Sequence, residues 1–259
     1  MGREVLNGKH GRILTFPRTD LRLVVGMKNY VASLSCGKDS LAMVLKLIEE
    51  NKPLTHCVMF DTGMEFSSIY NNLEKLRVIL NEHDIHLEII KPKTHWLEDM
   101  LLRVVCKGKQ NEHYGYEWCG GVCRWRTTDK IQAINKYLNS LGNYVQYIGI
   151  ASDEPSRIKK ENNKIYPLVE WGMSEKDCLN YCYSKGFDWD ENGVELYDVL
   201  DRVSCWCCSN KNLKELKNIY LYLPDYWYKL KALQSRIDRP FRRDGKTIFD
   251  LEERFRNEV

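Results

Sequence analysis

The sequence has no apolar stretch that approaches the roughly 18 residues a membrane-spanning helix needs. Its N-terminus also lacks the basic segment, apolar segment and small-residue cleavage site of a secretory signal peptide. These absences argue against a membrane partner, and we expect a cytoplasmic protein.

Strong charge of one sign is also absent. The formal net charge is only +3 at pH 7, which does not by itself imply a nucleic acid or a membrane surface as partner. Hydrophobic residues make up 43% and charged residues 29% of the chain, as in globular proteins. A chain of 259 residues can bury a sizeable core, so we expect one α/β domain with a smaller appendage.

A Walker A loop, G-x-x-x-x-G-K-[ST], is missing, because Asp39 follows Gly37 and Lys38 and no glycine stands five positions before Gly37. The local pattern is nevertheless that of a phosphate-binding loop. Residues 31–34 are apolar and strand-like, a polar turn follows, and apolar residues recur at helical spacing from Leu41. Such a turn points a helix N-terminus at one spot, where Gly37 lets an anion approach and Lys38 adds charge. An ordinary serine-rich turn is the alternative.

The turn matches S-x-G-x-D-S and resembles the loop of the PP-loop ATP pyrophosphatases. It is most similar to the branch that contains the phosphoadenosine-phosphosulfate (PAPS) reductases, whose usual loop is S-G-G-K-D-S. Cys36 replaces the first of those glycines, so the turn must accommodate a side chain there. The resemblance implies that the nucleotide is bound by Ser33, Ser35, Gly37, Lys38, Asp39 and Ser40.

Further segments resemble this family in the expected order. Residues 61–65 are similar to its D-T-G-x-E segment, which implies that Asp61 lies beside the adenine nucleotide. Residues 149–157 are similar to G-I-R-A-D-E-S-x-R, with Gly149 and Arg157 retained and Ala151 in place of the first arginine. Because arginine can grip phosphate or sulfate bidentately, this loss suggests a ligand with less negative charge than the family's reductase substrate.

Strand-like and helix-like segments alternate along the chain. In addition to the strand before the loop, we expect strands at residues 54–61, 86–90 and 144–150. We expect the main helices at residues 41–51, 67–82 and 174–185, and another that ends near residue 138. The alternation predicts a doubly wound, mostly parallel α/β sheet with ligands at the carboxyl ends of its strands. The resemblance implies the adenine nucleotide alpha hydrolase-like version of that fold.

Three regions are expected. Residues 1–29 are predicted to form an N-terminal arm or hairpin, residues 30–210 the PP-loop domain, and residues 211–259 a helical C-terminal region. In the last region basic and aromatic residues alternate, which provides charge for phosphates and flat rings for bases. An amphipathic helical cap with a solvated charged face is the alternative reading of the same pattern.

The ten cysteines favour metal binding or redox chemistry over disulfides in a cytosolic chain. Cys119 and Cys123 form a C-x3-C pair, and Cys205 and Cys208 form a later C-x2-C pair. Four such thiolates suit either an iron-sulfur cluster or zinc, and spacing does not separate the two metals. The resemblance implies a 4Fe-4S cluster near the nucleotide, with Cys208 favoured over Cys207 as the ligand. Buried cysteines without a role are the alternative.

No cysteine follows Cys208, so the chain lacks the C-terminal E-C-G-x-H motif whose thiol attacks sulfur in the family's assimilatory reductases. The resemblance then implies ATP-dependent chemistry with Mg2+, in which an acceptor is adenylated, pyrophosphate leaves and sulfur displaces AMP. Lys38, Asp39 and Arg157 are the expected catalytic residues. Expected partners are a nucleic acid or nucleotide acceptor and a sulfur-donor protein such as a cysteine desulfurase.

Two alternatives stay open. The first is a sulfonucleotide reductase that acts on adenylyl sulfate or its phosphorylated form with an external thiol. The second is a non-catalytic nucleotide-binding module with structural zinc.

Overall fold

The computed structural model of the chain describes residues 28–119, 123, 126–159 and 161–258. The predicted N-terminal arm lies almost wholly outside these residues, and so do residues 120–122 between the first pair of cysteines. None of the helices in the described ranges is both long and apolar enough to span a membrane.

The centre of the molecule is a five-stranded sheet in the order β3-β2-β1-β6-β7, and every neighbouring pair is parallel. Its strands are β1 (Asn29–Leu34), β2 (His56–Phe60), β3 (His86–Ile90), β6 (Tyr144–Ile148) and β7 (Lys164–Ile165). The predicted parallel α/β sheet is therefore confirmed. Because β1 is central in the sheet, its carboxyl end lies between the ends of β2 and β6.

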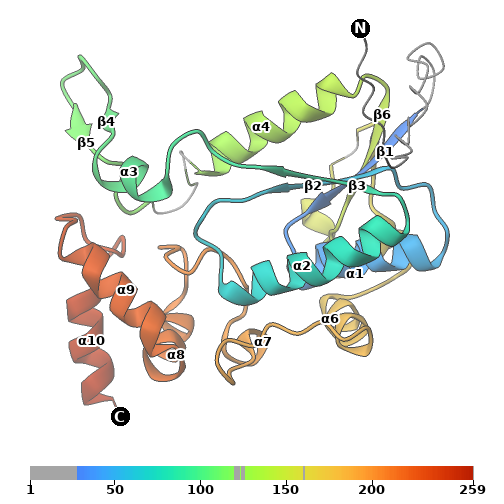
Figure 1. Cartoon of the computed structure of the whole chain (residues 1–259). Helices are drawn as coiled ribbons and strands as arrows, with labels where there is room; N and C mark the ends of the chain where they lie inside the picture. The colour runs from blue at the N-terminus through green and yellow to red at the C-terminus, as the bar shows by residue number, and fades with distance from the viewer. Residues whose placement is uncertain (1–27, 120–122, 124–125, 160, 259) are drawn as a thin grey trace, which may run out of the picture.

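Helices cover both faces of the sheet, so the doubly wound arrangement is also confirmed (Figure 1). One face carries α1 (Lys38–Glu49) and α2 (Ser67–Glu82), with α6 (Glu175–Ser184) packed against α1, and the other carries α4 (Arg126–Ser140). In α1 the predicted apolar positions Leu41, Val44 and Leu45 are buried, and Ile48 is partly buried. The helix begins at Lys38 rather than Leu41, because Gly37 is its extended N-cap residue.

Several short elements were not predicted. A helix and a hairpin follow β3, namely α3 (Trp96–Leu101) with β4 (Val104–Val105) and β5 (His113–Tyr114). A 3-10 turn (Pro155–Arg157) and α5 (Pro167–Glu170) flank β7, and α7 (Leu196–Val199) follows α6. These elements have two to six residues, too few to show a hydrophobic period.

The C-terminal region is helical, as predicted, and consists of α8 (Leu213–Tyr222), α9 (Pro224–Gln234) and α10 (Ile248–Asn257). Its buried apolar residues belong to the same hydrophobic cluster as those of α1 and as Cys57 and Met59 of β2. Trp227 lies at ring-centroid distances of 5.4 Å from Tyr220 and 5.9 Å from Phe255. Some aromatic residues of the predicted nucleic-acid surface are therefore core residues, as the helical-cap alternative requires.

Candidate nucleotide and thiol site

The loop between β1 and α1 is a tight turn with one residue in the left-handed region. Cys36 has φ of 54°, in the left-handed region that favours glycine, and its side chain is fully buried. The indole N–H of Trp189 donates to the carbonyl of Cys36 at 2.9 Å, which holds the strained residue in place. The turn thus accommodates a side chain where the resembled family has glycine.

Two serines close the loop. The Ser35 N–H donates to Ser40 Oγ at 3.1 Å, and the two serine hydroxyls lie 3.0 Å apart. Gly149, just beyond β6, packs against the same turn. A Cβ atom on Gly149 would lie 2.9 Å from Ser40 Cα, a contact with backbone that cannot move aside cheaply. The close approach therefore requires glycine at this position.

Lys38 is held by two carboxylates. Its ammonium lies 2.5 Å from Glu175 Oε2 and 3.2 Å from Asp39 Oδ1. Burial lowers the pKa of Lys38, but the hydrogen bonds that it donates to Glu175 and Asp39, together with both acidic charges, outweigh burial and raise its pKa. Burial raises the pKa of Asp39, and the Lys38 charge offsets that rise only in part. Lys38 therefore stays cationic at the mouth of the loop.

A cavity of about 410 Å³ opens over this turn. Seven of the predicted residues line it, namely Ser35, Gly37, Lys38, Asp39, Ser40, Gly149 and Arg157. Ser33 and Asp61 are not among the described residues that line it. Ser33 Oγ instead accepts from the Gln146 amide at 2.7 Å, and Asp61 Oδ1 accepts from Gly63 N–H and Tyr70 O–H, both at 2.8 Å.

The same cavity contains residues that sequence reasoning missed, among them Glu175, Tyr197 and Arg202. The capping box at the start of α6 predicts where the helix with Glu175 begins. This sequence pattern does not predict which residue the Glu175 side chain contacts. Lys211 is the first basic residue of the C-terminal region, but it does not lie on an exposed charged surface. The residue is 3% exposed, lines the cavity, and its ammonium donates to Ser204 Oγ at 3.2 Å. The same ammonium lies 5.5 Å from the centroid of the Phe66 ring.

A second cavity, of about 520 Å³, contains cysteines from both predicted pairs. Its cysteines are Cys119, Cys123, Cys205, Cys207 and Cys208. Folding therefore gathers the quartet around one space, although the pairs are far apart in sequence. The wall between the two cavities is shared, since both are lined by Ser35, Val203, Ser204, Cys208 and Asn210.

The thiols differ in their surroundings. Cys207 is 6% exposed, and its Sγ lies 3.3 Å from Met64 Sδ. Cys205 Sγ lies 3.8 Å from Glu65 Oε1, and burial raises the pKa of Cys205 well above its usual value. Cys208 lines both cavities, whereas Cys207 lines only the second.

The donor chemistry of the second cavity fits a thiolate-bound cluster or zinc. The spacing of the side chains is not that of a closed site, since no three His, Cys, Asp or Glu side chains in the described ranges are close enough to hold a metal ion. The metal assignment therefore stays a prediction.

A buried ion pair supports the thiol cavity. Arg126, at the start of α4, lies with its Nη2 3.3 Å from Asp99 Oδ2, and both side chains are at most 3% exposed. The same guanidinium donates to the Thr94 carbonyl at 3.3 Å. Arg126 also lines the cavity, so the pair links α3 and α4 at its edge.

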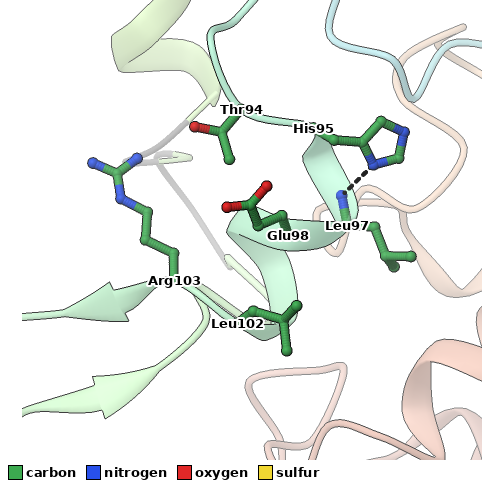
Figure 2. Close-up of a pocket in the computed structure, with 6 residues that line it drawn as sticks. All are labelled: Thr94, His95, Leu97, Glu98, Leu102 and Arg103. Carbon is green, nitrogen blue, oxygen red and sulfur yellow. Dashed lines mark hydrogen bonds between the residues drawn. The ribbon is translucent and has the colours of Figure 1, made fainter.

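Figure 2 shows a different hollow, of about 540 Å³, on α3. In it Nδ1 of His95 accepts the Leu97 N–H at 3.3 Å and so caps the helix. The other lining residues are Thr94, Glu98, Leu102 and Arg103. None of its lining residues belongs to the two cavities above, so this hollow is separate from the candidate site.

Comparison with known proteins agrees with this geometry. The family model of the phosphoadenosine phosphosulfate reductase domain matches residues 29–211. An uncharacterized protein of Methanocaldococcus jannaschii is 22% identical over 229 residues, which cover 78% of this chain and 40% of that protein. The phosphoadenosine 5'-phosphosulfate reductase of Buchnera aphidicola is 26% identical over 161 residues, which cover 58% of this chain and 60% of that protein. The matches thus span less than two thirds of either relative.

Among solved structures, the U34-tRNA thiolase of Methanococcus maripaludis with its 4Fe-4S cluster is similar to this chain. The two have 13% sequence identity and a TM-score of 0.44, and the match covers 89% of this chain and 72% of the thiolase.

Proposed function

Because the chain belongs to the phosphoadenosine phosphosulfate reductase domain family, we propose that it is an ATP-dependent sulfur-transfer enzyme that forms AMP and pyrophosphate and acts on a nucleic acid or nucleotide. One observation carries the proposal. The phosphate-loop cavity and the thiol cavity share a wall that includes Cys208. A nucleotide in the first cavity and sulfur in the second would therefore meet at that wall.

The first cavity suits a polyphosphate. The N-terminus of α1 supplies backbone donors, and Lys38, Arg157 and Arg202 supply positive charge. Arg157 pairs with Glu154, and Nη2 of Arg202 lies 3.5 Å from Glu154 Oε1. A phosphate that enters would compete with this carboxylate for the guanidinium groups.

The chemistry begins when an oxygen of the acceptor attacks the α-phosphate of ATP. The bond to the β-phosphate oxygen breaks, and pyrophosphate leaves with both electrons of that bond. Lys38 and the loop N–H groups stabilise the charge that develops on the leaving group. Asp39 would hold Mg2+, which supplies further charge neutralisation. A sulfur nucleophile then displaces AMP from the acceptor, so that sulfur replaces the activated oxygen.

Cys119, Cys123, Cys205 and Cys208 would hold a 4Fe-4S cluster, with zinc as the alternative metal. Such a cluster, when bound, would hold or deliver sulfide beside the nucleotide. Iron, zinc and acid-labile sulfide measured on protein purified without oxygen would distinguish the two metals.

The test is Lys38→Ala, compared with Lys46→Ala on the same helix. Lys46 pairs with Glu50 at 3.0 Å and does not line the cavity. With mixed RNA as acceptor and sulfide as donor, Lys38→Ala should lower pyrophosphate release by about 100-fold or more, because a charge that stabilises the leaving group is lost. Lys46→Ala should retain the activity. Thermal unfolding of both variants checks that they fold.

Unchanged pyrophosphate release in Lys38→Ala would overturn the site assignment. Wild-type protein that binds ATP but releases no pyrophosphate would be a nucleotide-binding module instead. Turnover of adenylyl sulfate with thioredoxin would identify a reductase.

A further inference from the structure

A groove of about 630 Å³ lies between α3 and α9, at the end of the molecule where Figure 1 shows these helices facing each other. Its α3 side consists of Trp96, Leu97 and Leu101. Its α9 side includes Tyr226, Lys229 and Leu233, and Arg236 follows that helix. Neither the nucleotide assignment nor the thiol assignment uses this groove.

The groove has an aromatic wall. The rings of Trp96 and Trp206 meet edge to face with centroids 5.7 Å apart, and Trp206 lies 6.1 Å from Tyr226. Trp96 also packs against Gly63, where a Cβ atom would lie 2.9 Å from the indole Cδ1. The Tyr226 hydroxyl donates to Glu191 Oε2 at 3.0 Å, which fixes its ring. Trp206 and Tyr226 are each only 6% exposed, so they support Trp96, the partly exposed ring of the three, which is left to face an occupant.

Two cations stand at the groove. The Lys229 ammonium lies 4.5 Å from the Tyr226 ring centroid and 5.9 Å from that of Trp206. Lys229 and Arg236 are both exposed, and neither forms an ion pair with an acid among the residues that the structure describes. Other cations of the C-terminal region do, since Lys217 pairs with Glu258 and Lys231 with Glu252. Positive charge is thus left for a partner at this groove.

The groove reaches the thiol cavity. Glu65 lines both spaces, and its Oε1 lies 3.8 Å from Cys205 Sγ. Trp206 lies between Cys205 and Cys207 in the sequence. The two cysteines line the thiol cavity, and the Trp206 ring lines the groove. An occupant of the groove would therefore extend toward the sulfur side of the candidate site.

We propose that this groove binds an unstacked base of a single-stranded polynucleotide, with the neighbouring phosphates on Lys229 and Arg236. Flat rings stack on bases of any sequence, and unpaired cations neutralise the phosphates beside them. An acidic peptide would use the cations but not the aromatic wall. The inference rests on the proposed function, because it assigns that reaction a polynucleotide acceptor.

The test measures binding of a fluorescein-labelled single-stranded RNA of mixed sequence by anisotropy, over a range of salt concentrations. The charge variant is Lys229→Glu with Arg236→Glu. Its control, Lys176→Glu with Lys52→Glu, changes net charge equally at exposed positions outside the groove. The ring variant is Trp96→Ala. Its control is Tyr228→Ala, an aromatic on α9 that is 65% exposed and lies outside the groove.

Each groove variant should weaken RNA binding about tenfold or more, because stacking and phosphate contacts each contribute strongly to such sites. The charge variant should also reduce the slope of log K against log salt, since fewer counterions are released. Both controls should bind within about twofold of wild type, because they leave the stacking wall intact. All four should bind ATP like wild type, and thermal unfolding shows whether Trp96→Ala has folded.

Several results would overturn the inference. Groove variants that bind RNA like wild type, or wild-type protein that binds no RNA, would contradict it directly. An abasic strand that binds as tightly as the RNA would show that no base is stacked. A polyglutamate peptide that competes equally well would show that the groove recognises negative charge alone. Pyrophosphate release is measured separately. If RNA binding depends on the groove but the protein releases no pyrophosphate, the proposed function is wrong and the groove assignment stands. If the protein releases pyrophosphate but RNA binding does not depend on the groove, the groove assignment is wrong and the proposed function stands.

Discussion

The hydroxyl oxygen of Tyr197 accepts a hydrogen bond from the backbone N–H of Lys38 at 2.9 Å. Lys38 is the first residue of α1, so this N–H is one of the donors that a phosphate at the helix N-terminus would use. The Tyr197 ring is held edge to face against Trp189, with centroids 4.8 Å apart. Tyr197 thus takes a donor that the proposed nucleotide needs.

Tyr197→Phe should tighten ATP binding about fivefold, because it removes a competitor for the N–H worth about 1 kcal/mol. The ring contact with Trp189 is kept, so folding should not change. Calorimetry with ATP and with pyrophosphate measures the effect. Tyr181→Phe, which removes a hydroxyl that donates to Glu49 outside the cavity, is the control. Weaker binding by Tyr197→Phe would show instead that the hydroxyl itself contacts the ligand.

Asp39→Asn should stabilise the fold at pH 8. Burial raises the pKa of Asp39, so stability from its neutral form is present below its unfolded pKa of about 4 and is lost as the pH rises through the folded pKa. Asparagine does not ionise and avoids that loss, and Lys38 keeps Glu175 as partner. Urea unfolding at pH 4 and pH 8 tests the prediction. A destabilised variant at pH 8 would show that the pair with Lys38 outweighs burial.

Gly149→Ala should destabilise the protein by about 1–3 kcal/mol, because the added methyl group would press on the backbone of Ser40. Denaturant unfolding measures the loss. Gly37→Ala is the matched control for folding, since its Cβ would lie 3.4 Å from the Tyr197 hydroxyl, an ordinary contact. Equal stability of the two variants would mean that β6 and α1 can move apart.

The sheet and the long helices could be predicted because their apolar periods are long enough to read. Helix 67–82 and strand 86–90 were predicted with the bounds that the structure has. The two-residue strand β7 shows no alternation, and its place in the sheet depends on pairing with Gln146 and Tyr147 of β6. The pairing with β6 forms only when the chain folds, so the local sequence of β7 does not predict it.

The candidate site also contains residues that could be predicted from the sequence and residues that could not. The loop residues follow one another in sequence, so a motif could identify them. Glu175 and Tyr197 reach Lys38 from distant segments, through contacts that no local pattern records. The family resemblance implied that Ser33 binds the nucleotide, but Ser33 does not line the loop cavity. Its hydroxyl accepts from Gln146 on the neighbouring strand instead.

Cys208→Ser should lower the iron or zinc content of anaerobically purified protein, because Cys208 lines both cavities and is a predicted ligand. Cys207→Ser is the matched control. Its Sγ packs against Met64, so the hydroxyl should cost about 1–3 kcal/mol of stability while the metal content stays unchanged. Metal and sulfide analysis with thermal unfolding separates these effects. If Cys207→Ser loses the metal and Cys208→Ser keeps it, Cys207 is the ligand instead of Cys208. The metal ligand would then not line the nucleotide cavity.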